Sequence, residues 1–196
     1  MVRNDARADG AMNDFDLHDD MTTSRHYHLS KNQHRDNVSA TMTHSPPIVF
    51  VPGSLHTSPR AASGRFWCVI GEQPFPMEGW SDAVVVVLGW WANALIRLNA
   101  QAGDMEVVHF MEGPYEVEIR RLADGTFRVS AVERRKLDVR RPGASDMSFA
   151  TLSNALIAAA TTVLEECRGA SWWSRDAASL QTAIEQLSTV TAQHEN

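Results

Sequence analysis

The chain has 196 residues, of which 43% are hydrophobic and 21% charged, and its formal net charge at pH 7 is −6. This length suits one domain with an appendage. The acidic balance argues against a general nucleic-acid binder, because nucleic-acid-binding domains are usually strongly basic. We therefore do not expect nucleic acid as a partner.

Residues 1–46 are polar and poor in aromatic side chains. They hold five Lys/Arg, seven Asp/Glu and five of the eight histidines, but only two aromatic residues. So little apolar surface cannot offset the loss of chain entropy on folding, so we predict that this segment is disordered. A metal site at its histidines would need preformed geometry, so we expect neither a metal nor another cofactor. These histidines include His26, His28, His34 and His44.

The sequence lacks the signals of an exported protein. Residues 1–46 show no basic start, apolar run and small-residue cleavage site in the order that a secretory signal requires. Cys68 and Cys167 are the only cysteines, and two such distant residues suggest neither a disulfide framework nor a zinc site. We therefore expect a cytoplasmic protein.

A folded domain is expected over residues 47–190, followed by a tail at 191–196. The first two elements read as short strands at 48–51 and 65–70, each an apolar run bounded by Gly, Pro and Ser. Both strands precede the most hydrophobic segment of the chain.

The segment 81–101 is predicted to be a mostly buried helix. Its uncharged core of 14 residues is too short to span a bilayer, so no membrane is expected as a partner. Ser81 is suited to cap the helix, and Trp80 to pack on Val85. The apolar residues repeat at three and four positions, which describes one helical stripe. The stripe consists of Val84, Val87, Leu88, Trp91, Leu95 and Leu98.

Three further strands are expected at 105–111, 115–122 and 126–132, joined by two Gly-containing turns. Apolar and charged residues alternate in the second and third, which is typical of an antiparallel sheet with one wet face. On that face we expect Glu116 and Glu118 close to Arg128.

Helical spacing returns at 146–168, and a last helix is predicted to start at the Ser174 cap. The order of elements is β-β-α-β-β-β-α-α. This order predicts an α+β fold, with helices packed on one face of an antiparallel sheet.

The segment 133–141 is the one concentration of positive charge. It lacks an aromatic residue for base stacking, and Glu133 and Asp138 interrupt it. We therefore expect a solvated strand end or loop instead of a phosphate-binding site. Its basic residues are Arg134, Arg135, Lys136, Arg140 and Arg141.

No catalytic motif stands out, and we name no catalytic residue. His109 lies three residues from both Glu106 and Glu112, a spacing that puts both acids on the opposite face of a strand. A cross-strand polar contact is therefore the expected role of His109. Trp172 and Trp173 stand between the last two helices, where at least one of them is expected to pack in the core.

Two strings together resemble a group of small bacterial proteins. The first runs from Trp80-x-Asp82 through a Val/Leu run to Trp90-Trp91, and the second is Phe110-Met-Glu-Gly-Pro-Tyr115. The group carries a W-x-D-(F/A)…L-x-W-W helix followed by an F-M-(D/E)-G-P-Y hairpin. It is similar to the immunity proteins of polymorphic and contact-dependent inhibition toxin systems. The match covers about residues 66–135, with Glu112 in place of Asp and Ala83 in place of Phe.

These features favour a non-enzymatic protein-interaction domain. The resemblance implies an immunity protein that binds and neutralises a cognate bacterial toxin, with an acidic surface that would attract a basic partner. The alternative is a small enzyme or ligand-binding domain with a pocket near His109, Glu112 and Tyr115. The oligomeric state stays open. The candidate interaction residues are Glu112, Tyr115, Glu116, Glu118, Trp172 and Trp173.

Overall fold

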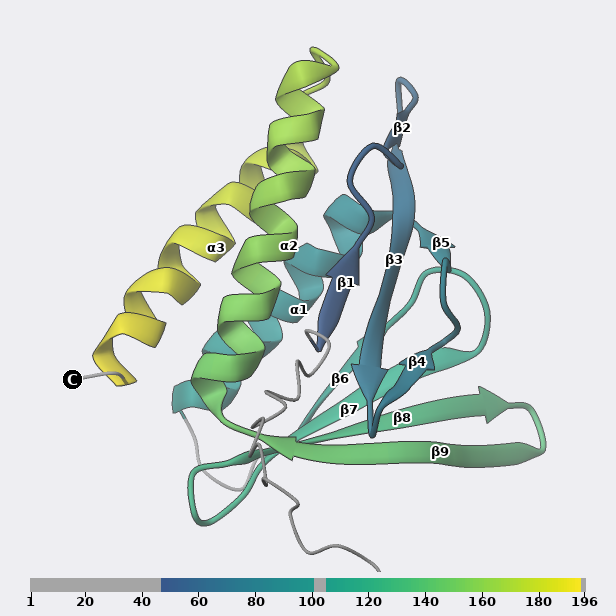
Figure 1. Cartoon of the computed structure of the whole chain (residues 1–196), viewed down its shortest axis with the longest axis vertical. Coiled ribbons are helices and arrows are strands. Elements are labelled where there is room, and N and C mark those ends of the chain that lie inside the picture. Colours follow the sequence, from purple (N-terminus) through teal and green to yellow (C-terminus); the bar gives the residue numbers. More distant parts are fainter. Residues whose placement is uncertain (1–46, 101–104, 195–196) are drawn as a thin grey trace, which may run out of the picture. The chain divides into compact units, whose positions relative to one another are not determined.

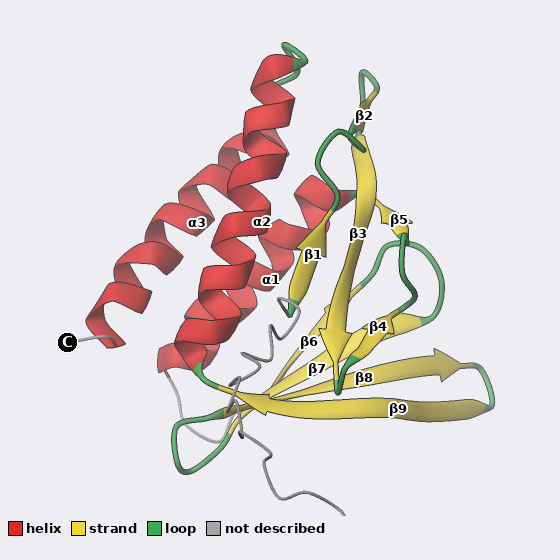
Figure 2. Cartoon of the chain, in the orientation of Figure 1, coloured by secondary structure: helices red, strands yellow, loops and turns green. Residues whose placement is uncertain are grey.

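The computed structural model describes residues 47–100 and 105–194 as two antiparallel sheets and three helices (Figures 1 and 2). The segment 1–46, with its predicted disorder and its histidines, lies outside the described residues. The first sheet contains β1 (Ile48–Phe50), β2 (His56–Thr57), β3 (Ala62–Ile70), β4 (Gln73–Phe75) and β5 (Ser81–Asp82). The second contains β6 (Met105–His109), β7 (Tyr115–Arg121), β8 (Phe127–Arg135) and β9 (Asp138–Met147). The helices are α1 (Val84–Ala100), α2 (Phe149–Gly169) and α3 (Arg175–His194).

The strands follow simple antiparallel connections. In the first sheet β3 pairs with each of the other four strands, and in the second the order is β6-β7-β8-β9. Helix α1 contacts both β3 and β6, while α3 packs on α1 and α2. Figure 2 shows the three helices together on one side of the strands. The predicted α+β class is therefore confirmed.

Helix α1 is the centre of the hydrophobic core. All six residues of the predicted apolar stripe are buried, including Trp91, which has no exposed surface. Trp90 lies off the stripe and is 43% exposed. In the described ranges no helix is long and apolar enough to cross a membrane. The most hydrophobic segment of the sequence is thus a helix in the core.

The start of α1 differs from the prediction. The helix begins at Val84, and the carbonyl of Ala83 accepts the first helical hydrogen bonds. Ser81 is therefore not the cap, because it lies in β5, paired with β3. The Trp80 ring contacts Tyr115, with ring centroids 5.1 Å apart.

The reason for this difference is the buried carboxylate of Asp82, which is 2% exposed. Its oxygens accept hydrogen bonds from the Trp80 indole N–H (3.1 Å) and the Ala83 backbone N–H (2.7 Å). They also accept the backbone N–H groups of Met111 (3.1 Å) and Glu112 (3.5 Å). The carboxylate thereby ties the start of α1 to the turn between β6 and β7.

An aromatic cluster surrounds this tie. Gly113, in the same turn, has φ of +75°, and a Cβ at this position would lie 2.7 Å from the Tyr115 ring. The F-M-E-G-P-Y string is therefore explained by close packing of its turn. Successive ring centroids lie 5.1–6.4 Å apart along the cluster. Its members in order are Trp91, Phe66, Phe110, Phe75, Tyr115 and Trp80.

Helices α2 and α3 carry one buried polar contact between them. The Thr191 hydroxyl donates to the Ser153 hydroxyl at 2.9 Å, and Ser153 in turn donates to the Phe149 carbonyl at 2.8 Å. Ser148 caps α2 by accepting the Thr151 N–H. Helix α3 continues through His194, beyond the domain boundary expected at residue 190.

Strand β9 was not predicted from the sequence. It contains charged residues, Pro142 and Gly143, all of which disfavour strands, yet it pairs along most of β8. The register shifts between Ala131 and Glu133, where β9 carries one extra residue opposite Val132. Such a bulge is typical of an edge strand. The basic segment 133–141 therefore consists of the exposed end of β8, a turn and the exposed start of β9, which agrees with the expected solvated strand end.

Replacing Asp82 tests the tie. We expect Asp82→Ala to lower the free energy of unfolding by about 3 kcal/mol, since it leaves buried donors without an acceptor. Urea unfolding followed by circular dichroism measures the change. Ser81→Ala is the control and should stay within about 0.5 kcal/mol, because Ser81 is exposed and caps nothing. An equal loss in both variants would contradict the assignment.

Candidate functional site

The second sheet has one face on the helices and one outer face. The pairing registers place the outer-face residues in rows across the four strands, such as His109 beside Glu116 and Arg120 beside Arg128. The outer face is defined by Val107, His109, Glu116, Glu118, Arg120, Arg128, Ser130, Val132, Arg134 and Arg141.

Glu116 and Glu118 lie on this face at the centre of an ion-pair network. Arg134 Nε lies 3.0 Å from Glu116, and its Nη2 lies 3.8 Å from Glu118. Arg141 Nη2 lies 3.0 Å from Glu118, and His109 Nδ1 lies 3.6 Å from Glu116. The cross-strand contact expected for His109 is thus present. Together with their basic partners, the two carboxylates form a mixed-charge surface instead of an acidic one.

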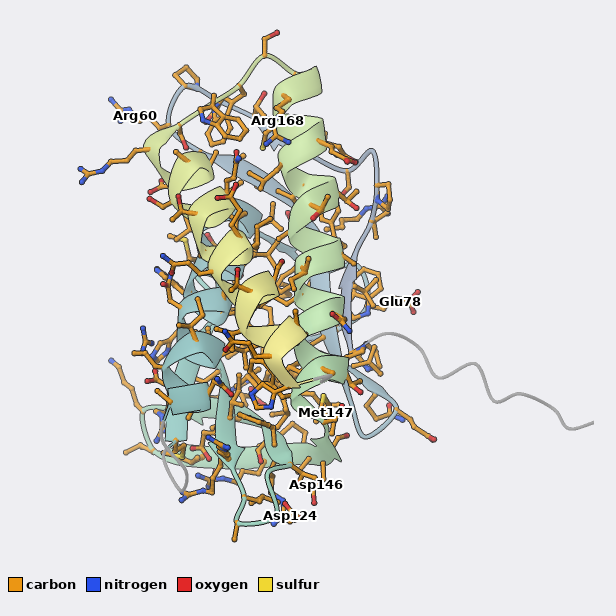
Figure 3. The ribbon with its side chains drawn as sticks, turned by 90° about the vertical axis from the view of Figure 1, so that its left-hand side faces the viewer. Arg60, Glu78, Asp124, Asp146, Met147 and Arg168 are labelled. Atoms are coloured by element: carbon orange, nitrogen blue, oxygen red, sulfur yellow. The ribbon has the colours of Figure 1, made fainter. Side chains whose placement is uncertain are left out.

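Arg128 was the partner expected for these carboxylates, and that prediction is wrong. Arg128 instead pairs bidentately with Asp146, at 2.8 and 2.7 Å, and lowers the pKa of that carboxyl through these hydrogen bonds. Asp146 lies close to Asp124 at one end of the domain (Figure 3). The sequence could not identify this partner because β9, which carries Asp146, was missing from the prediction.

The network covers an apolar residue on the outer face. Val132 has no exposed surface, although it points away from the helices and does not belong to the main core. Glu116 lies directly across from it and Arg134 two residues along its strand. The aliphatic parts of these side chains can shield Val132 while their charged groups pair. The centre of the outer face is therefore filled and ordered.

The β8–β9 hairpin, here residues 133–142, leaves two apolar side chains in solvent. Leu137 at the turn is 100% exposed, and Val139 is 42% exposed. Figure 1 shows this turn at the end of the second sheet away from the helices. Arg135 pairs with Glu133, and Arg140 with Asp138. Arg134 and Arg141 pair with Glu116 and Glu118, so within the described residues Lys136 is the basic residue of the hairpin that has no ion pair.

A groove lies between α1 and β6. Its cavity has a volume of about 380 Å³, and His109 is part of its wall. Glu112 and Tyr115 do not line this groove, so it differs from the pocket predicted around the three residues. The lining consists of Trp90, Asn93, Ala94, Arg97, Val107, Val108 and His109.

The remaining candidate residues do not join one site. Tyr115 packs in the aromatic cluster, while Glu112 is exposed on the turn beside it. Trp172 packs against the core and donates its indole N–H to the Ser58 carbonyl at 2.7 Å. Trp173 is 45% exposed, with the guanidinium of Arg168 4.8 Å from its ring centroid. Arg168 lies at the other end of the domain from Asp146 (Figure 3).

The two cysteine thiols offer little reactive chemistry. Burial raises the pKa of Cys68, whose thiol donates to the Phe75 carbonyl. Burial, with a smaller effect of Glu166, also raises the pKa of Cys167. Both thiols therefore stay protonated at neutral pH. In the part of the chain that the structure describes, no three His, Cys, Asp or Glu residues are grouped to hold a metal ion.

Two exposed hydrophobic side chains were not predicted from the sequence. Leu137 is an apolar residue inside a basic run, and Trp90 is a large apolar residue off the buried stripe of α1. Either break in pattern could have marked an exposed hydrophobic side chain. Comparison with known proteins does not add an assignment, because no family model, curated protein or solved structure matches this chain.

Arg134 is expected to stabilise the domain more than Arg140 does. Arg134→Ala removes the main partner of Glu116, whose side chain is only 11% exposed, and should cost about 1–2 kcal/mol. Arg140→Ala breaks an exposed pair in the same hairpin and should cost at most about 0.5 kcal/mol. Chemical denaturation of both variants measures the difference. Similar small losses would show that the network contributes little to stability.

The ion pair between Arg97 and Glu106 should give a pH-dependent stability. Hydrogen bonds from Arg97, at 2.8 and 2.7 Å, lower the pKa of Glu106 from its usual value of 4.5. The pair therefore stabilises the fold above that value and loses its effect as pH falls through the lower folded-state pKa. Arg97→Ala should be less stable than wild type near pH ~7, with the gap closing toward pH ~3.

Arg120→Ala is the control for this prediction, because Arg120 contacts Met105 and no carboxylate. Its stability relative to wild type should not change over the same pH range. A gap for Arg97→Ala that stays constant with pH would contradict the linkage to Glu106.

Proposed function

We propose that this domain is a non-enzymatic protein-interaction domain that contacts its partner through the β8–β9 hairpin. The observation that carries the proposal is Leu137, which is fully exposed at the turn between β8 and β9. An apolar side chain that stays in water contributes nothing to folding. It does contribute to binding when a partner buries it.

The surroundings of Leu137 indicate the chemistry of the partner. Arginine is enriched at the centres of protein interfaces, and here Arg135 and Arg140 flank the turn. Lys136 next to Leu137 forms no ion pair within the described ranges. The partner surface that fits is acidic at its rim, with an apolar pocket for Leu137.

Neutralisation of a bacterial toxin is the specific form of this proposal. Its support is the resemblance in the Trp80–Trp91 and Phe110–Tyr115 strings. A hairpin that enters a toxin cleft blocks the substrate without any chemistry of its own. Glu116 and Glu118 are ion-paired with Arg134 and Arg141 of the same hairpin, so the exposed turn at Lys136 and Leu137 is favoured over these carboxylates as the contact surface. We place the interaction in the cytoplasm, where the two free thiols suit a reducing environment.

Co-expression with the product of a neighbouring toxin-like gene tests the proposal. We expect the wild-type chain to restore growth and to form a complex. Leu137→Asp should weaken the complex at least about 30-fold, the effect of losing roughly 2 kcal/mol at an interface centre. Biolayer interferometry with the purified proteins measures this change.

Met77→Asp is the matched control, since Met77 is 52% exposed in a different loop, between β4 and β5. It should bind like wild type. If neither rescue nor a complex is seen, the toxin is not the partner. If Leu137→Asp binds as tightly as wild type, the hairpin is not the contact.

A further inference from the structure

The second sheet has a free edge at β6. Among the described residues, this strand pairs with β7 only. Phe110 N–H donates to the Tyr115 carbonyl at 3.0 Å and closes the β6–β7 hairpin. Antiparallel ladders alternate between residues that bond to the neighbour and residues that point away. Val108 therefore bonds to β7, while Val107 and His109 direct their backbone N–H and C=O groups away from it.

The two residues with outward backbone groups also line the groove between α1 and β6. Val107 and His109 both line its cavity of about 380 Å³, a size within the usual range of about 300–1,000 Å³ for ligand sites. Across from them stand Trp90 and Ala94 of α1. The groove thus combines unpaired strand groups on one wall with an exposed aromatic side chain on the other.

Arg97, paired with Glu106, stands at the far end of the groove. The Arg97 side chain is 59% exposed and gives its Nε and one terminal nitrogen to Glu106, which leaves donors on its other terminal nitrogen. Those donors suit a carboxylate of a ligand. Asn93 adds a side-chain oxygen, because only its Nδ2 is engaged, with the Gly89 carbonyl.

We propose that this groove binds an extended peptide segment of a partner protein, which adds to β6 as a further strand of the second sheet. Backbone hydrogen bonds to Val107 and His109 supply affinity in this mode, and side-chain pockets supply specificity. The peptide carries a large apolar side chain that packs on Trp90 and Ala94, and a carboxylate that meets Arg97. The site goes beyond the hairpin contact proposed above and does not depend on it.

The other edge of the sheet does not offer the same site. The backbone N–H of Gly71, in the turn between β3 and β4, donates to the hydroxyl of Ser145 in β9 at 2.5 Å. This turn therefore covers one half of β9. The other half contains Pro142, which lacks a backbone donor, and an extra bulged residue. Both are features that protect an edge from strand addition. The free edge for a peptide is therefore that of β6.

A phage-displayed library of random peptides, about eight residues long, panned on the full chain tests the proposal. We expect enriched peptides with an aromatic or aliphatic residue and an acidic residue at a fixed spacing. A fluorescein-labelled peptide of the enriched sequence then serves as the probe in anisotropy titrations. Trp90→Ala should weaken the binding of this peptide about tenfold. A second peptide, with its acidic residue replaced by the amide, should bind wild type more weakly than the first peptide does. Arg97→Ala should bind both peptides equally.

Backbone pairing has its own readout. Two peptides would be made, one with its odd-numbered and one with its even-numbered backbone amides N-methylated. One of them should lose binding and the other should bind within about twofold of the unmodified peptide, because only alternate amides face β6. Val107→Pro should also abolish peptide binding, since it removes a backbone donor that points away from β7 and leaves the hydrogen bonds between β6 and β7 intact. If Val107→Pro fails to fold, the methylated pair and Trp90→Ala still decide the question.

The proposal is overturned if panning enriches no peptide, or if the enriched peptide binds equally in both methylation phases or to Trp90→Ala. Leu137→Asp should bind the peptide like wild type. If Leu137→Asp abolishes peptide binding instead, the peptide lies on the hairpin and the groove is not its site.

Discussion

The carboxylate of Asp82 is the interaction on which the rest of this structure depends. It holds the chain extended before α1, and it accepts two backbone N–H groups of the turn that joins β6 to β7. The two sheets are thereby joined at one buried anion, next to the aromatic cluster. A buried charge is costly unless every lone pair is engaged, and here four donors meet it. The position of β6, and therefore of the groove beside it, follows from this contact.

Much of the fold could be predicted from periodicity. The stripe from Val84 to Leu98 marked α1 because its spacing matches one face of a helix, and the alternation in β7 and β8 marked a sheet with one wet face. The start of α1 was missed for a physical reason. Ser81 and Asp82 are both good capping residues, and only the distant turn at Met111 decides that Asp82 serves another role.

The candidate surface was harder to predict, because its charges are balanced by residues far apart in sequence. Glu116 and Glu118 looked acidic on their own strand, while Arg134 and Arg141 looked like a separate basic run. The pairing of β7, β8 and β9 cancels the two. Strand β9 could not be recognised, since its residues have low strand propensity and its place is set by the β8 register. What stays uncancelled is the apolar turn at Leu137.

The buried hydroxyl pair of Thr191 and Ser153 has a consequence for how α2 and α3 choose their alignment. The buried residues of both helices are mostly apolar, with Ser153 and Thr191 as polar exceptions. A shift of α3 by one turn would separate the two hydroxyls, which would keep only their bonds to the carbonyls of Phe149 and Leu187 in their own helices. The contact therefore favours the observed alignment by about the 1 kcal/mol of one hydrogen bond. One polar contact acts here as a selector among arrangements of the same two helices.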